Sequence, residues 1–156
     1  MDKQYAIFDM DGTLVDSMVY WKNLAKEYLA SKGITHIPDV ILEKIKPMTM
    51  TESATLFIEE FGLNGTPESI ANEMNALMDT HYYRDIPLKK GVREFLDFCK
   101  DKKIPMGIAT SNSAELLGYF LKAHELNNYF KVIITGSDGL KGKPAPDMYL
   151  EAAKRL

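Results

Sequence analysis

The sequence has 156 residues, of which 46% are hydrophobic. A chain of this length can bury one core with room for a modest insertion, but not two full-sized domains. Its 22 acidic and 19 basic residues give a formal net charge of −3, and no run of lysine or arginine marks an arm that could bind nucleic acid or anionic lipid. We therefore expect a protein that acts on small molecules, with no nucleic-acid or membrane partner.

The first predicted element is a strand at residues 5–8, an apolar run that ends abruptly in acids and glycine. This pattern is typical of a strand buried on both faces in a parallel sheet. The run is too short for a signal sequence or a membrane span, so we predict a cytoplasmic location.

The next stretch, up to about residue 85, shows helical periodicity and no strand signal. Four apolar stripes at three-and-four spacing predict four helices. Gly33 closes the first, Thr49 and Glu52 have capping-box spacing ahead of the third, and Pro67 opens the fourth. We predict that residues 16–85 form a folded helical insertion.

Strand and helix patterns alternate in the rest of the chain. Apolar strand runs at residues 104–109 and 131–135 are separated by a helical stripe at 116–121, and another helical stripe precedes them. This order predicts a doubly wound α/β core built from residues 1–15 and 86–156. The only cysteine, Cys99, shares a helical face with Val92, Phe95 and Leu96, and we interpret it as a core residue.

Each predicted strand is followed by polar side chains. Asp9 and Asp11 follow the first strand, Thr110 follows the second, and Lys143 lies a few residues beyond the third. Because ligands bind outside the carboxyl ends of the strands in open α/β sheets, we expect these four side chains to converge on one site.

The residue types at this edge suit phosphoryl transfer. A phosphate dianion repels an attacking carboxylate, so Asp9 can act as a nucleophile only with a cation beside it, for which Lys143 and Mg²⁺ are the candidates. Mg²⁺ prefers oxygen ligands, such as an Asp9 carboxylate oxygen and a nearby backbone carbonyl. Asp11 could protonate a departing alkoxide and later deprotonate the water that hydrolyses an aspartyl phosphate.

Neighbouring residues could bind the phosphate itself. Gly12 permits a tight turn with close backbone approach, and the Thr110 hydroxyl with adjacent amides can contact phosphate oxygens. Ser111 and Asn112 are further candidates, although a strand end followed by a helix cap would also explain this segment. Likewise, Lys143 could be a solvated loop cation.

A calcium loop is the structural alternative for the acidic stretch that begins at Asp9. An EF-hand loop starting there would need glycine at its sixth position and glutamate at its twelfth. Leu14 and Tyr20 occupy those positions. The spacing therefore excludes an EF-hand.

Three segments, residues 9–17, 108–112 and 142–147, together resemble the motifs of the haloacid dehalogenase superfamily of phosphohydrolases and phosphomutases. The helical insertion after the first motif is similar to that of the subgroup with β-phosphoglucomutase and phosphoglycolate-type phosphatases. The resemblance implies a Rossmann-like core with a parallel sheet, an inserted α-helical cap and a Mg²⁺ cofactor. It implies catalytic roles for Asp9, Asp11 and Lys143, substrate contacts by Gly12, Thr110, Ser111 and Asn112, and metal binding by Asp9 and Asp11.

One departure from the family pattern concerns the end of the sequence. Members of the family normally continue through another strand to a final acidic motif that supplies a further magnesium ligand, whereas this sequence ends at Leu156. We therefore expect an incomplete metal site. We also expect one exposed edge of the strand at residues 5–8, which could promote self-association.

The resulting hypothesis is a magnesium-dependent phosphatase of small phosphorylated metabolites, including sugar phosphates, that forms an aspartyl phosphate on Asp9. A sugar phosphomutase is an alternative, but residues 47–52 lack the arginine that the mutase cap uses for its substrate. A dehalogenase is disfavoured, because a halide leaves without the proton that Asp11 could supply. A noncatalytic phosphate-binding fragment is the alternative from another class.

Overall fold

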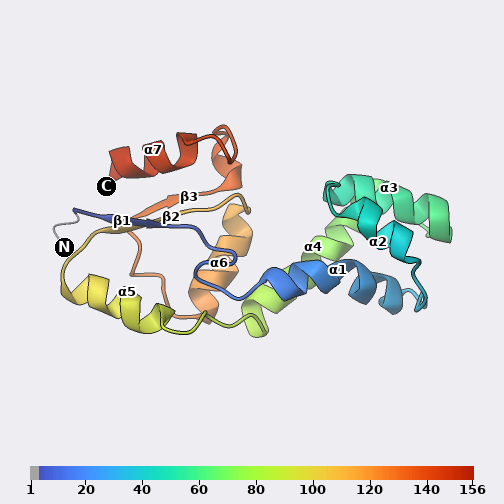
Figure 1. Cartoon of the computed structure of the whole chain (residues 1–156), viewed down its shortest axis with the longest axis horizontal. Coiled ribbons are helices and arrows are strands. Elements are labelled where there is room, and N and C mark those ends of the chain that lie inside the picture. The colour runs from blue at the N-terminus through green and yellow to red at the C-terminus, as the bar shows by residue number, and fades with distance from the viewer. Residues whose placement is uncertain (1–3) are drawn as a thin grey trace. The chain divides into compact units, whose positions relative to one another are not determined.

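The computed structural model describes residues 4–156, and the chain divides into two compact units (Figure 1). The first unit combines Met1–Met18 with Tyr82–Leu156, and the second comprises Val19–His81. The boundaries between the units lie a few residues from residues 16 and 85, the predicted limits of the helical insertion. The function of the second unit as a cap remains a prediction.

The first unit contains a parallel sheet of the described strands β1 (Ala6–Phe8), β2 (Met106–Ala109) and β3 (Val132–Ile134), in the order β1-β2-β3. Phe8 pairs with Ile108, and Ala109 pairs with Ile134, so the carboxyl ends of the strands lie level with one another. The predicted α/β fold with a parallel sheet is confirmed. This arrangement brings the segments that follow the three strands to one edge.

Three helices and a short 3₁₀ turn accompany the sheet. They are α5 (Val92–Asp101), α6 (Ala114–Ala123), η1 (Gly136–Asp138) and α7 (Asp147–Arg155), and Figure 1 shows α5 and α7 on opposite sides of the sheet. Met148 and Ala152 of α7 are buried against Ala109 and Ile134 of the sheet. This packing anchors the start of α7, and so the loop that leads into it.

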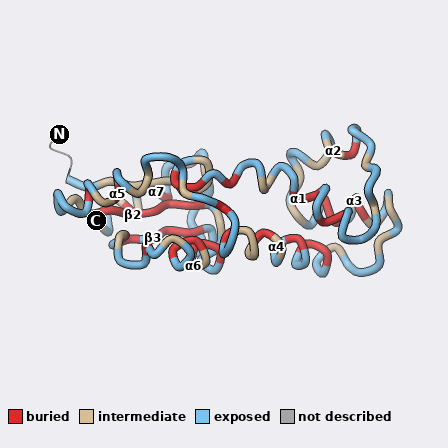
Figure 2. Tube along the Cα trace, turned by 90° about the horizontal axis from the view of Figure 1, so that it is seen from below, coloured by how far each residue is buried: buried red, intermediate tan, exposed pale blue. Residues whose placement is uncertain are grey.

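Burial differs between the strands (Figure 2). All four residues of β2 are buried, whereas the three residues of β1 are only partly buried and Tyr5 is exposed. The expectation that β1 is buried on both faces is therefore wrong, because β1 is an edge strand of the described sheet. An apolar edge of this kind can pair with another chain, so self-association remains a prediction.

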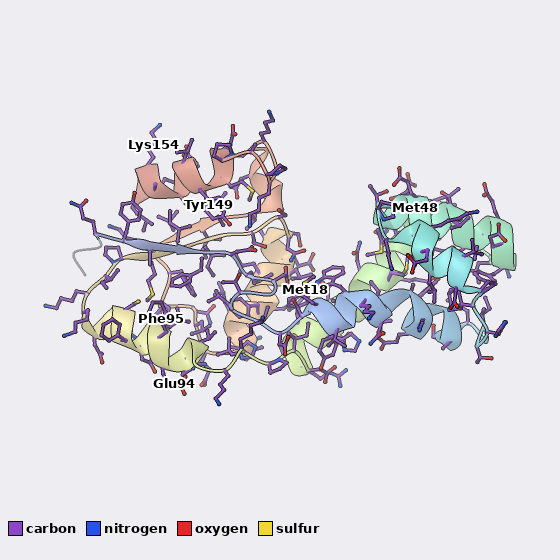
Figure 3. The ribbon with its side chains drawn as sticks, in the orientation of Figure 1. Met18, Met48, Glu94, Phe95, Tyr149 and Lys154 are labelled. Carbon is purple, nitrogen blue, oxygen red and sulfur yellow. The ribbon has the colours of Figure 1, made fainter. Side chains whose placement is uncertain are left out.

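The buried face of α5 is narrower than the spacing of its apolar residues predicts. Leu96 and Cys99 are buried, and burial raises the pKa of the Cys99 thiol, in agreement with a core role. Phe95 (Figure 3) is 51% exposed, stacks on Phe98 and contacts Phe8 edge-on. Phe95 therefore lies at the exposed rim of the apolar stripe rather than in the core.

The second unit contains helices, as predicted from the apolar stripes. They are α1 (Met18–Ser31), whose first residue belongs to the first unit, α2 (Asp39–Ile45), α3 (Met50–Phe61) and α4 (Pro67–Arg84), whose last residues return to the first unit. The predicted capping box of α3 is present: the Thr49 hydroxyl accepts a hydrogen bond from the Glu52 amide, and the Glu52 carboxylate accepts one from the Thr49 amide.

A polar cluster joins α1 to α4 inside the second unit. The buried Tyr28 donates a hydrogen bond to Glu73 (2.8 Å), and Lys32 forms an ion pair with the same carboxylate (2.8 Å). Burial, together with the Glu73 carboxylate, raises the pKa of the Tyr28 phenol. The phenol is therefore a neutral donor that fixes the pairing of the two helices.

Within residues 4–156, no helix combines the length and the apolar character that a membrane-spanning helix requires.

Candidate active site

The first and third motifs meet at the carboxyl edge of the sheet. Lys143 lies in the loop between η1 and α7, and its Nζ donates hydrogen bonds to Oδ1 of Asp9 (2.7 Å) and to the backbone carbonyl of Ala109 (2.9 Å). The Lys143 and Asp9 side chains are 24% and 38% exposed. The predicted cation is thus beside the predicted nucleophile, and both side chains are partly exposed to solvent.

The surroundings of Lys143 preserve its charge. Partial burial lowers the pKa of its ammonium group, but the hydrogen bonds and charges of Asp9 and Tyr149 outweigh this effect, so that the net pKa is raised. The ammonium lies 5.0 Å from the ring centre of Tyr149, which extends from α7 (Figure 3). Lys143 is therefore a permanent cation at physiological pH.

The two oxygens of Asp9 have different partners. Oδ1 accepts hydrogen bonds from Lys143 and from the amide of Met10 (2.9 Å). Oδ2 accepts none from any residue in the described part of the chain. One carboxylate oxygen is held by the protein, and the other is available to react or to bind a cation.

Asp11 is surrounded by neutral donors. Its Oδ1 accepts hydrogen bonds from the Ser17 hydroxyl (2.6 Å) and from the Tyr82 phenol, and its Oδ2 accepts one from the side-chain amide of Asn112. Ser17 and Tyr82 are both buried. Asp11 is therefore held by the first motif, the second motif and the end of α4.

Gly12 lies in the predicted turn, which follows Asp9 and Asp11 and precedes α1. Its φ of 73° lies in the left-handed region that favours glycine. The turn is closed by hydrogen bonds from the Gly12 amide to the Val15 carbonyl (3.0 Å) and from the Leu14 amide to the Met10 carbonyl (2.9 Å). Met10 is fully buried, so the turn is anchored in the core between Asp9 and Asp11.

Residues of the second motif form hydrogen bonds within the protein. Thr110 is buried, and its hydroxyl accepts a hydrogen bond from the Asn112 amide (3.2 Å). The Asn112 side chain contacts Asp11, while Ser111 is exposed. The cap of α6 is Ser113, whose hydroxyl accepts from the Leu116 amide (3.2 Å). Residues 110–112 are therefore not needed as a helix cap.

Gly136 lets the loop after β3 approach the second motif closely. Its amide donates to the Asn112 carbonyl (2.8 Å), and a Cβ at this position would lie 2.2 Å from the Ser111 carbonyl oxygen. Any side chain here would push the two loops apart. Gly136 was not among the residues predicted for the site, although its place directly after a strand run was a usable signal.

Two of the contacts with Asp11 were also not predicted from the sequence. Tyr82 is 71 residues away from Asp11 in the sequence, and a tyrosine within a helical stripe carries no signal that distinguishes it from a packing residue. The side chain of Asn112 was expected to contact substrate, whereas it contacts Asp11 in this structure. Neither contact follows from motif spacing.

The described residues offer few side chains that could hold a metal ion. They contain no group of three or more histidine, cysteine, aspartate or glutamate side chains that could hold a metal ion. Asp138 forms local hydrogen bonds: its Oδ2 accepts hydrogen bonds from the backbone amide (2.6 Å) and the hydroxyl (3.0 Å) of Thr135. The free oxygen of Asp9 and the backbone carbonyl of Asp11 match the preference of Mg²⁺ for oxygen, but they are few.

The family model for haloacid dehalogenase-like hydrolases matches residues 6–156. The chain belongs to this family. The match spans all three motifs and both units, so the predicted family, the fold class and the hydrolase class of enzyme are confirmed.

Relatives and solved structures agree with this assignment. A phosphorylated carbohydrates phosphatase of Thermotoga maritima is 27% identical over 150 residues, which cover 96% of this chain and 69% of the relative. Hexitol phosphatase B of Escherichia coli is also 27% identical, over 97% of this chain and 68% of the relative. A solved Thermotoga maritima structure, provisionally classed as a β-phosphoglucomutase, matches with a TM-score of 0.85 and 26% identity, covering 98% of this chain and 70% of its own.

We predict that Lys143→Met weakens binding of trifluoroberyllate, a mimic of a phosphoryl group on Asp9, by about 1.5–3 kcal/mol, the usual loss for a charge-assisted hydrogen bond. The exposed Lys141 offers a matched control, because Lys141→Met removes the same charge without touching Asp9. Isothermal titration measures both. Equal affinities for the wild type and Lys143→Met would show that Lys143 is only a loop cation.

Proposed function

We propose that this protein is a magnesium-dependent phosphatase of small phosphorylated metabolites, acting through an aspartyl phosphate on Asp9. The contact between Lys143 Nζ and Asp9 Oδ1 (2.7 Å) carries this proposal, because it places a cation where an anionic nucleophile must meet an anionic substrate. Asp11, two residues along the chain, adds the acid and base that hydrolysis needs.

In the first half of the reaction, one oxygen of the Asp9 carboxylate attacks phosphorus, and the bond between phosphorus and the leaving oxygen breaks. Asp11, protonated in this step, gives its proton to the leaving oxygen, so an alcohol departs rather than an alkoxide. Lys143 lowers the repulsion between the carboxylate and the phosphate. The products of this half are the alcohol and phosphorylated Asp9.

In the second half, a water molecule attacks the same phosphorus while Asp11, now a carboxylate, takes one of its protons. The bond between phosphorus and the Asp9 oxygen breaks, which releases inorganic phosphate and restores the Asp9 carboxylate. Asp11 ends protonated, ready for the next substrate. One residue can perform both proton transfers because they occur at the same position in opposite directions.

The phosphate oxygens require donors besides Lys143. The Thr110 hydroxyl and the backbone amides after Gly12 and Thr110 are the candidates from this chain. Ser111 is exposed and could add a hydroxyl, whereas Asn112 would need to leave Asp11 to contact substrate. Thr110 is thus a better candidate than Asn112.

The free Asp9 oxygen and the Asp11 carbonyl would hold Mg²⁺. The ion would neutralise part of the charge that the Asp9 carboxylate and the substrate phosphate bring together. With so few ligands from the described residues, we expect weak magnesium binding by this chain.

The names of the relatives support the proposed substrate class. A phosphorylated carbohydrates phosphatase and a hexitol phosphatase are similar to this chain over more than nine-tenths of its length. Residues 16–85, as a cap, would exclude water and select the substrate in a cytoplasmic enzyme. The structural likeness to a provisional β-phosphoglucomutase keeps a sugar phosphomutase as the second candidate, although residues 47–52 contain no arginine.

Replacing Asp9 with asparagine should abolish phosphate release while the fold is retained, because the shape is kept and the nucleophilic charge is lost. Phosphate release from a generic aryl phosphate and circular dichroism measure the two effects. Asp101→Asn, an exposed change on α5, is the matched control and should be silent. Turnover by a folded Asp9→Asn variant would show that Asp9 is not the nucleophile.

Replacing Asp11 with asparagine should reduce turnover of an alkyl phosphate about 10²–10⁴-fold, the usual contribution of a general acid, and the first half-reaction of an aryl phosphate far less. The reason is that an alkoxide needs a proton to leave, whereas an activated phenolate does not. Release of the alcohol or phenol in the first turnover is the measurement. Equal losses with both substrates would argue against Asp11 as the acid.

A further inference from the structure

The two oxygens of the Asp11 carboxylate are occupied unequally. Oδ1 accepts two hydrogen bonds, from Ser17 and Tyr82, and Oδ2 accepts one, from Asn112. A carboxylate oxygen has two lone-pair positions. Counting donors from the described residues, both lone-pair positions of Oδ1 accept hydrogen bonds. One lone-pair position of Oδ2 accepts none.

Tyr82 is the more rigid of the two donors to Oδ1. Its side chain is 1% exposed, and an aromatic ring packed in a core cannot change rotamer without disturbing its neighbours. The position of its hydroxyl is consequently set by the ring. The Ser17 hydroxyl, although buried, sits on a short side chain that has three staggered rotamers.

The arrangement suits both protonation states of Asp11. When Oδ2 carries a proton, Oδ1 is the carbonyl oxygen of a carboxylic acid and still accepts two hydrogen bonds. When the proton has left, Oδ1 accepts the same two bonds. A proton can therefore move on and off Oδ2 without any rearrangement of Tyr82 or Ser17.

We propose that Tyr82 is a positioning residue for Asp11: it occupies Oδ1 and thereby makes Oδ2 the oxygen that exchanges a proton with the leaving group and with water. This inference rests on the proposed function, because it assumes that Asp11 is the acid and base. Rates of proton transfer depend steeply on orientation. Tyr82 would thus support turnover without touching the substrate.

The test is the variant Tyr82→Phe, which removes the hydroxyl and keeps the ring. Its kcat for an alkyl phosphate should fall about tenfold, with KM nearly unchanged, since orientation affects the proton-transfer step rather than binding. Release of phenol from an aryl phosphate in the first turnover should fall much less. The neighbouring Tyr83 is exposed, and Tyr83→Phe is the matched control with no expected change.

Two further measurements separate positioning from a general loss of structure. Tyr82→Phe should bind trifluoroberyllate as the wild type does, because Asp9 and Lys143 are intact. Adding Tyr82→Phe to Asp11→Asn should cause no further loss, because the phenol acts through the Asp11 carboxylate.

Three results would overturn the inference: wild-type rates for Tyr82→Phe, equal losses with both substrates, or a further loss in the double variant. If Asp9→Asn is inactive in the same experiments, these results contradict only the function assigned to Tyr82, and the proposed phosphatase function stands. If the wild type lacks turnover or a folded Asp9→Asn retains it, the proposed function itself fails, and the inference fails with it.

Discussion

The interaction on which the rest of the site depends is the bridge made by the Lys143 ammonium. From the loop after β3, it reaches Asp9 at the end of β1 (2.7 Å) and the Ala109 carbonyl at the end of β2 (2.9 Å). One cation from the loop that follows β3 thus joins the carboxyl ends of β1 and β2. The parallel order β1-β2-β3 makes this possible, because it brings segments more than a hundred residues apart to one edge.

The bridge also gives two nearby acids different surroundings. Asp9 and Asp11 flank the fully buried Met10, yet Asp9 faces a cation, whereas Asp11 accepts hydrogen bonds from neutral donors. Two carboxylates in different surroundings can serve as nucleophile and as acid or base in the same reaction. The turn at Gly12 keeps them close, and the packing of Met10 keeps them in place.

Much of this architecture could be predicted from periodicity and motif spacing. The three strands, the helices of the second unit, the Thr49 capping box and the turn at Gly12 depend on local patterns, and each is present. The donors that Tyr82 and Asn112 provide to Asp11 depend on how distant segments pack. The partial burial of β1 depends on its place in the sheet, which a run of apolar residues does not encode.

The proposed mechanism depends on transfer of the phosphoryl group to Asp9. Its most direct test uses Asp11→Asn with an aryl phosphate, because the phosphorylated enzyme should form quickly and hydrolyse slowly. Rapid acid quenching, reduction with borohydride and peptide mass spectrometry then locate any aspartyl phosphate as homoserine. We expect homoserine at position 9 only when substrate is present. An unmodified Asp9 in a sample that has released a full equivalent of phenol would contradict it.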